Sequence, residues 1–128
     1  MYKLIINEIP PSNNKFQGTG NRYAYQNIKK YWAELIIYNS LMQIKNVKTF
    51  EKSIVELHYF FKDKRRRDPD NYSGKFVLDG LVKAKLIKDD SFDNIELVLK
   101  GGYDKENSRL EIKITEVVRW IKLKTKEN

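Results

Sequence analysis

The chain has 128 residues, and its 41% hydrophobic fraction excludes a disordered chain and predicts one domain over residues 1–128. With no cysteine and one histidine, disulfides, thiolate nucleophiles and zinc sites of Cys or His ligands are excluded, so a metal would need oxygen ligands. The formal net charge of +8 favours a polyanionic partner, usually nucleic acid. No apolar run approaches the ~20 residues that span a bilayer, and we expect a cytoplasmic protein without membrane contact.

The first half of the chain predicts one strand and one long helix. Residues 2–6 read as a strand that runs into a turn at residues 10–14, and a polar loop follows over residues 15–21. Apolar residues at spacings of three and four predict a helix from Tyr25 to Ile44, with one face packed on a sheet.

The second half predicts three strands and a second helix. Residues 53–63 have apolar side chains at both parities, which favours a central strand covered on both faces. A helix is expected from Asn71 to Leu86, then strands over residues 95–99 and 110–115. The apolar alternation changes phase near Glu116, where we expect a bulge or a strand end, and residues 122–128 are expected to fray. The order β-α-β-α-β-β predicts a small α/β (α+β) domain with a mixed sheet and two main helices.

An acidic tripeptide follows the central strand. Pro69 disfavours the helical region for Asp68, and an extended chain would point Asp68 and Asp70 to the same side. Two carboxylates held close repel each other unless a cation lies between them, and Mg²⁺ favours such ligands. The alternative is ordinary turn chemistry, in which Asp70 caps the helix that starts at Asn71.

Two further acidic positions are also ambiguous. Asp89 and Asp90 form a second pair after the helix, which suits either a metal ligand or a turn. Asp79 lies within the helix between Lys75 and Lys83, each four residues away. These three form a surface ion-pair ladder, or else Lys75 is a positive neighbour of the metal site.

Taken in order, these segments resemble a known family. Arg66-Arg67-Asp68-Pro69-Asp70-Asn71, then Lys75, Asp79-Gly80-Leu81 and Asp89-Asp90-Ser91 resemble the RusA family of Holliday junction resolvases, found in bacteria and their prophages. The match covers roughly residues 54–100, and Pro10-Pro11-Ser12-Asn13 is similar to the family's N-terminal loop.

The resemblance implies a homodimeric nuclease that uses Mg²⁺, or Mn²⁺ in its place, to resolve four-way DNA junctions by symmetric cleavage in recombination and repair. Its essential carboxylates carry over onto Asp68, Asp70 and Asp90, and its catalytic lysine onto Lys75. One departure is that Gly74 stands where the family often has the lysine. Either the helix starts one residue later or the role of the lysine differs.

Around these residues we expect a DNA-binding surface and a dimer interface. Phosphates would meet a basic block beside the acidic motif, unless that block is only a solvated end of the strand. The first helix or the last strand could supply the dimer interface. The DNA-binding residues would be Lys62, Lys64, Arg65, Arg66, Arg67, Asn13 and Asn14, with Asn71, Asp79 and Asp89 in support.

Two rival functions stay open. One is a non-catalytic basic module that binds nucleic acid and uses its aspartates as caps. The other is a metal nuclease that acts on flaps or replication forks. His58, alone on the central strand, is interpreted as a structural residue.

Overall fold

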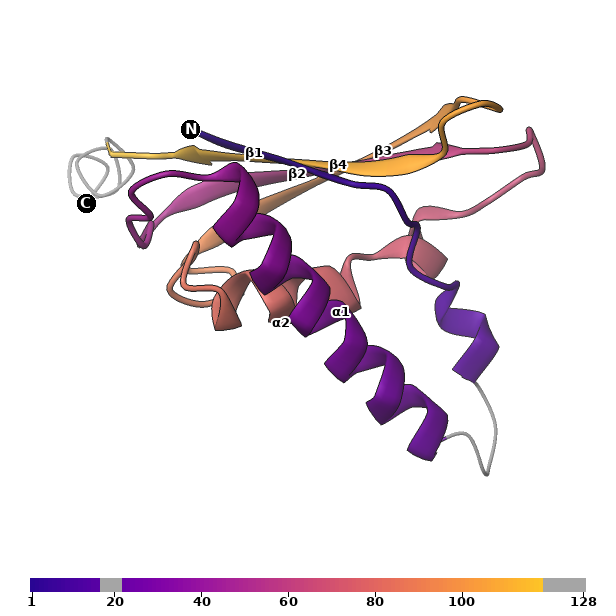
Figure 1. Ribbon diagram of the computed structural model, residues 1–128, viewed down its shortest axis with the longest axis horizontal. Coiled ribbons are helices and arrows are strands. Elements are labelled where there is room, and N and C mark those ends of the chain that lie inside the picture. The colour runs from indigo at the N-terminus through magenta and orange to yellow at the C-terminus, as the bar shows by residue number, and fades with distance from the viewer. Residues whose placement is uncertain (17–21, 119–128) are drawn as a thin grey trace.

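The computed structural model describes residues 1–16 and 22–118, which form a four-stranded sheet with two main helices (Figure 1). In chain order the elements are β1 (Tyr2–Ile6), η1 (Asn13–Phe16), α1 (Arg22–Gln43), β2 (Ser53–Phe61), η2 (Pro69–Tyr72), α2 (Lys75–Lys83), β3 (Ile95–Tyr103) and β4 (Arg109–Glu116). The predicted α+β fold and the order β-α-β-α-β-β are confirmed. Residues 122–128, expected to fray, lie outside the described residues.

The sheet is mixed, with strand order β1-β4-β2-β3. β2 pairs in parallel with β3, from Ser53 opposite Ile95 to Phe61 opposite Tyr103. β4 runs antiparallel to both β2 and β1. The parallel pair requires a crossover, which α2 provides beneath the sheet.

In the described part of the chain, helices cover only one face of the sheet (Figure 1). Along β2 the odd-numbered residues Val55, Leu57 and Tyr59 are buried, while the even-numbered residues are half-buried. The prediction of a strand covered on both faces was therefore wrong. On the uncovered face the ring of Phe60 lies under the Arg109 guanidinium, 4.0 Å from the ring centroid, and stacks on His58. These neighbours explain how an apolar residue is tolerated there.

The two helices cross at a glycine. A Cβ atom on Gly80 would lie 2.9 Å from Ile36 Cγ1 and 3.3 Å from the Cα of Ala33 in α1. The absence of a side chain therefore allows α2 to pack directly on the buried face of α1. Trp32 and Ile36 from that face and Leu81 from α2 belong to the same hydrophobic cluster as the inner face of the sheet.

Element ends differ most from the predictions around proline and glycine. The helix expected from Asn71 starts at Lys75, because the chain is extended before Pro69 and makes a short 3-10 turn first. β3 continues through Gly101 and Gly102 to Tyr103, beyond the predicted end at residue 99, because it stays paired with β2 along its length. β4 ends at Glu116, so the expected strand end is confirmed.

A side chain of α1 protects one edge of the sheet. At the β1 edge, the Gln43 side chain accepts from the Ile5 N–H and donates to the Ile5 carbonyl, both at 2.9 Å. This side-chain amide therefore occupies the Ile5 N–H and carbonyl, which could otherwise pair with a strand of another molecule. β4 lies inside the sheet and offers no free edge. Within the described ranges, no helix combines the length and the apolar character needed to cross a bilayer.

Candidate functional site

The Asp68-Pro69-Asp70 segment leads from the end of β2 into η2. Asp68 has φ −101° and ψ 140°, so the expected extended conformation before Pro69 is confirmed. Its carbonyl accepts from the Asn71 N–H at 3.0 Å, which closes the turn. The Asp68 side chain makes no capping bond and instead pairs with Arg66, 3.2 Å from Nε to Oδ1.

Asp70 does not cap the following helix. The residue before α2 is Gly74, in the left-handed region at φ 85°, where a Cβ would lie only 2.6 Å from Leu57 Cδ1. In the described part of the chain the exposed Asp70 carboxylate has no hydrogen bond or ion pair. The capping alternative is therefore wrong for Asp70, and its oxygens are free for another partner.

An asparagine from the N-terminal loop secures this turn. The Asn13 Nδ2 donates to the Asp70 carbonyl and to Ser73 Oγ, both at 3.0 Å, across almost sixty residues of sequence. Asn13 was predicted to contact DNA, but its amide nitrogen is already occupied by the protein. It acts here as a support for the segment that carries Asp70.

The three consecutive arginines fall into two roles. Arg67 is largely buried and lies over the Phe61 ring, with its Nη2 2.8 Å from Asp63 Oδ1. The Arg65 N–H and the Arg67 guanidinium lower the pKa of Asp63 from its ordinary value. Arg65 and Arg66 are exposed, although each also reaches an aspartate in the same loop. Arg65 and Arg66, with Lys62 and Lys64, are thus the block's accessible charges.

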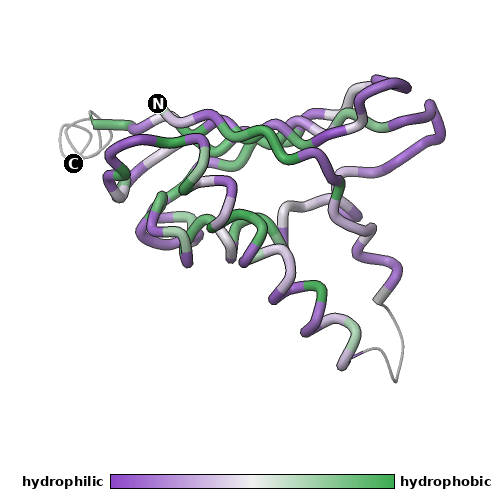
Figure 2. Tube along the Cα trace, in the orientation of Figure 1, coloured by the Kyte–Doolittle hydropathy of each residue, from purple (hydrophilic) through white to green (hydrophobic). Residues whose placement is uncertain are grey.

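Beside these arginines is a polar hollow of about 560 Å³. It joins the N-terminal loop to the segment after β2, at the hydrophilic end of the molecule (Figure 2). Guanidinium, amide and hydroxyl groups in such a concave surface suit a phosphate or another anion. The lining residues are Ser12, Asn14, Arg65, Arg66, Arg67, Asp68, Asn71 and Tyr72.

Lys75 and Asp79 do not form the full ion-pair ladder. Asp79 pairs with Lys83 at 3.2 Å, as the surface alternative predicts. Lys75, the first residue of α2, instead places its Nζ 4.9 Å from the ring centroid of Tyr25 in α1. Its ammonium therefore lies at the α2 terminus that follows the Asp70 turn.

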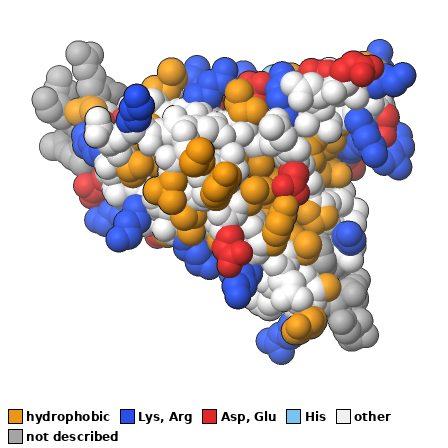
Figure 3. All heavy atoms as spheres, in the orientation of Figure 1, with side chains coloured by type: hydrophobic (Ala, Val, Ile, Leu, Met, Phe, Trp, Pro, Cys, Tyr) orange, Lys and Arg blue, Asp and Glu red, His pale blue; other side chains and the backbone are white. Residues whose placement is uncertain are grey.

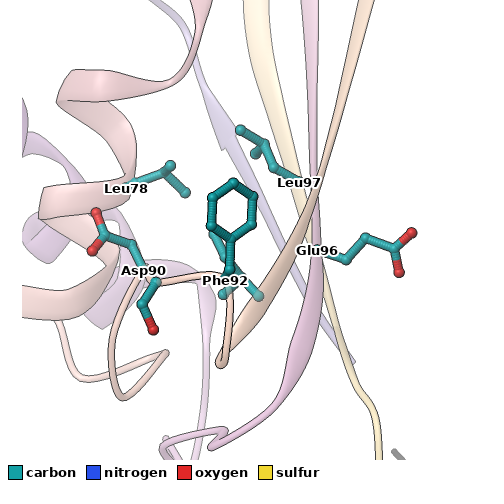
Figure 4. Close-up of a pocket in the computed structure, with 7 residues that line it drawn as sticks. Leu78, Asp90, Phe92, Glu96 and Leu97 are labelled. Carbon is teal, nitrogen blue, oxygen red and sulfur yellow. The ribbon is translucent and has the colours of Figure 1, made fainter.

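Asp90 lies in a different hollow, between α2 and β3 (Figure 4). The ring of Phe92 stands between Leu78 of α2 and Leu97 of β3, and the Asp90 carboxylate lies on the α2 side. The Asp90 N–H donates to Asp89 Oδ1 at 2.9 Å. The Asp90 carboxylate itself has no hydrogen bond or ion pair among the described residues.

The three predicted metal ligands are not gathered into one group. Over residues 1–16 and 22–118, no set of three His, Cys, Asp or Glu side chains is arranged to hold a metal ion. The topology explains this, because Asp68 and Asp70 follow the carboxyl end of β2. Asp90 precedes Ile95, which pairs with the amino end of the same strand. The donor types suit a hard cation, but their arrangement here does not.

Some residues around the hollow were missed from the sequence. Ser12, Ser73 and Tyr72 were not predicted, although Ser12 belongs to the Pro-Pro-Ser-Asn turn that was noted. The Tyr72 ring packs edge-on against Phe61 at the end of β2. The polar turn near the N-terminus was a signal in the sequence, but residue spacing does not show that this turn lies against the segment after β2. His58 stacks on Phe60 on the open face, as a structural residue can.

Comparison with known proteins does not assign a family. No family model matches the chain, and no curated protein sequence matches it significantly.

Proposed function

We propose that this chain is a magnesium-dependent endonuclease that resolves four-way DNA junctions during recombination and repair, acting in the cytoplasm as a homodimer. The proposal rests on the ordered acidic motif. One observation carries it furthest: two exposed aspartates lie on one turn beside the arginine-lined hollow. Arg65 and Arg66 would bind phosphates there, while Asp68 and Asp70 would present carboxylate oxygens.

The metal would be Mg²⁺, with Mn²⁺ as a substitute, because the candidate ligands are all carboxylate oxygens. Since Asp90 is not grouped with Asp68 and Asp70, the proposal requires DNA and cation to draw the Asp89–Asp90 turn toward them. No side-chain bond of Asp70 or Asp90 in the described chain would have to break. Lys75, at the start of α2, would add positive charge near the phosphate.

A second candidate is a non-catalytic module that binds branched nucleic acid. The absence of a three-ligand group in the described ranges favours it. Both candidates use the same basic hollow, so binding alone does not separate them. Cleavage does.

The test is cleavage of synthetic four-way junctions, flaps, forks and linear duplex by the full chain with Mg²⁺, Mn²⁺ or a chelator. We expect metal-dependent cutting that is fastest on junctions. Asp70→Asn should bind junctions normally and cut at least about 100-fold more slowly, as expected for a ligand rather than a group that only supports one. Glu106→Gln, an exposed carboxylate in the β3–β4 turn, should cut like wild type.

Three outcomes contradict the proposal in different ways. If wild type cuts none of the substrates with either metal, the protein is the binding module. If Asp70→Asn cuts as fast as wild type, the site is elsewhere. If flaps or forks are cut faster than junctions, the substrate class is wrong although the chemistry stands.

A further inference from the structure

The outer face of α1 carries large apolar side chains, three of which are mostly exposed in the described chain. Tyr38 is 61% exposed, Leu41 72% and Met42 68%. Hydrophobic side chains gather over α1 in the space-filling view (Figure 3). We name this surface the α1 stripe: Tyr31, Leu35, Tyr38, Leu41 and Met42. Within the fold Leu35 also packs against the core, and the Tyr31 hydroxyl donates to Glu8.

The α1 stripe has the spacing of a helix-to-helix seam. Tyr31, Leu35, Tyr38 and Met42 follow one another at steps of four, three and four. That is the repeat with which one helix packs along another. The buried residues Trp32, Ala33, Ile36 and Ser40 face the opposite way, onto α2 and the sheet. α1 therefore has two apolar faces, and the fold uses one.

We propose that the α1 stripe is the surface through which two copies of this chain associate, with their α1 helices packed antiparallel about a two-fold axis. A two-fold axis through the middle of the stripe would place Tyr31 of one copy near the partner's Met42. Glu34 is the one charged residue between Tyr31 and Met42 in the helix. No run of like charges would oppose itself across the axis.

The area is adequate for such a pair. Each of the exposed side chains offers on the order of 100 Å², so the stripe supplies about half of the roughly 800 Å² that each partner buries in a standard interface. Residues of α1 that flank the stripe would supply the rest. The other predicted interface, the last strand, has no free edge for pairing with a second copy, because β4 lies inside the sheet.

This inference does not depend on nuclease activity, and its test is the oligomeric state of the full chain. Analytical ultracentrifugation should find wild type as a concentration-dependent dimer and Tyr38→Glu/Met42→Glu as a monomer. Both positions are exposed, so thermal unfolding should report little change in monomer stability. The matched control is Phe92→Ser, which removes a ring that is 95% exposed on another surface and should leave the dimer intact.

A second measurement stays decisive if the double variant misfolds. Since the chain has no cysteine, Tyr38→Cys gives one thiol near the middle of the stripe. Mild oxidation should link it into a disulfide dimer, whereas Phe92→Cys should stay largely unlinked. A monomeric wild type at every concentration, or a dimer that is lost in Phe92→Ser but kept in Tyr38→Glu/Met42→Glu, overturns the proposal.

Discussion

Arg65, Arg66 and Arg67 are neighbours in sequence but differ in role. Arg67 donates through Nη1 to the Asp63 and Arg65 carbonyls, pairs with the Asp63 carboxylate and covers Phe61. It holds the loop after β2 in shape, so it is not available as a simple phosphate ligand. Arg65 and Arg66 remain exposed beside it, which makes them the stronger candidates for contact with DNA.

The Asp63–Arg67 pair predicts a pH dependence of stability. The pKa of Asp63 is lower in the folded protein than its ordinary value of 3.8. Its contribution is therefore present above pH ~4 and is lost as pH falls through the folded pKa. Asp63→Asn should lower the melting temperature at pH 7, and the difference from wild type should shrink in acid.

Thermal melts from about pH 2.5 to about pH 7, a span that brackets the carboxyl range, check this expectation. Glu51→Gln is the matched control, because the Glu51–Lys88 pair is exposed and such pairs contribute little. A difference between Asp63→Asn and wild type that stays constant with pH would show that the carboxylate charge is not responsible.

At the scale of elements, the crossing of α1 and α2 depends on one missing side chain. A Cβ on Gly80 would lie closer to Ile36 Cγ1 than real Cβ atoms approach, and it would also crowd the Cα of Ala33. The crossing in turn fixes where α2 lies under β2 and β3. It also fixes the start of α2, where Lys75 follows the turn that carries Asp70.

Gly80→Val should destabilise the fold by ~1–3 kcal/mol, the usual range for overpacking a core. Chemical denaturation, with the midpoint compared at equal slope, measures it. Lys30→Val, at an exposed position of α1, should change stability by well under ~1 kcal/mol, as surface substitutions usually do. A Gly80→Val protein as stable as wild type would mean that the two helices can separate without loss.

At the scale of the whole molecule, charge is unevenly distributed. The accessible cations of the basic block lie at one end, beside a polar hollow, whereas the hollow between α2 and β3 carries Asp90 and Glu96 among apolar side chains. If DNA binds at the first of these, salt should weaken binding through displacement of counterions from those cations.

Replacing Lys64, Arg65 and Arg66 by glutamine should weaken binding to all DNA sequences alike. The slope of log affinity against log salt should fall by ~0.9 for each DNA phosphate that the variant no longer neutralises. Fluorescence anisotropy titrations over a range of salt measure both quantities. A control with Lys30, Lys45 and Lys88 replaced by glutamine removes the same charge elsewhere, and an equal effect from it would show that only net charge matters.

Much of the architecture was readable from sequence because it depends on short-range physics. Alternation of apolar residues identified the strands, the three-and-four spacing identified α1, and Pro69 set the extended conformation of Asp68. The absence of cysteine also directs any metal to oxygen ligands, and the basic balance predicts a polyanionic partner, which stays a prediction. Each of these follows from the residues themselves or from neighbours a few positions away.

Tertiary structure alone decided the rest, because those features depend on contacts between distant segments. Strand order placed β4 inside the sheet, and the packing of one face of α1 left an apolar stripe on its other face exposed. The parallel pairing of β2 with β3 set Asp90 apart from Asp68 and Asp70. The Asn13 side chain donates to the Asp70 carbonyl across the fold, and the Arg67 guanidinium pairs with Asp63 and lies over the Phe61 ring. No spacing rule encodes such contacts, since they arise only when the chain closes on its core.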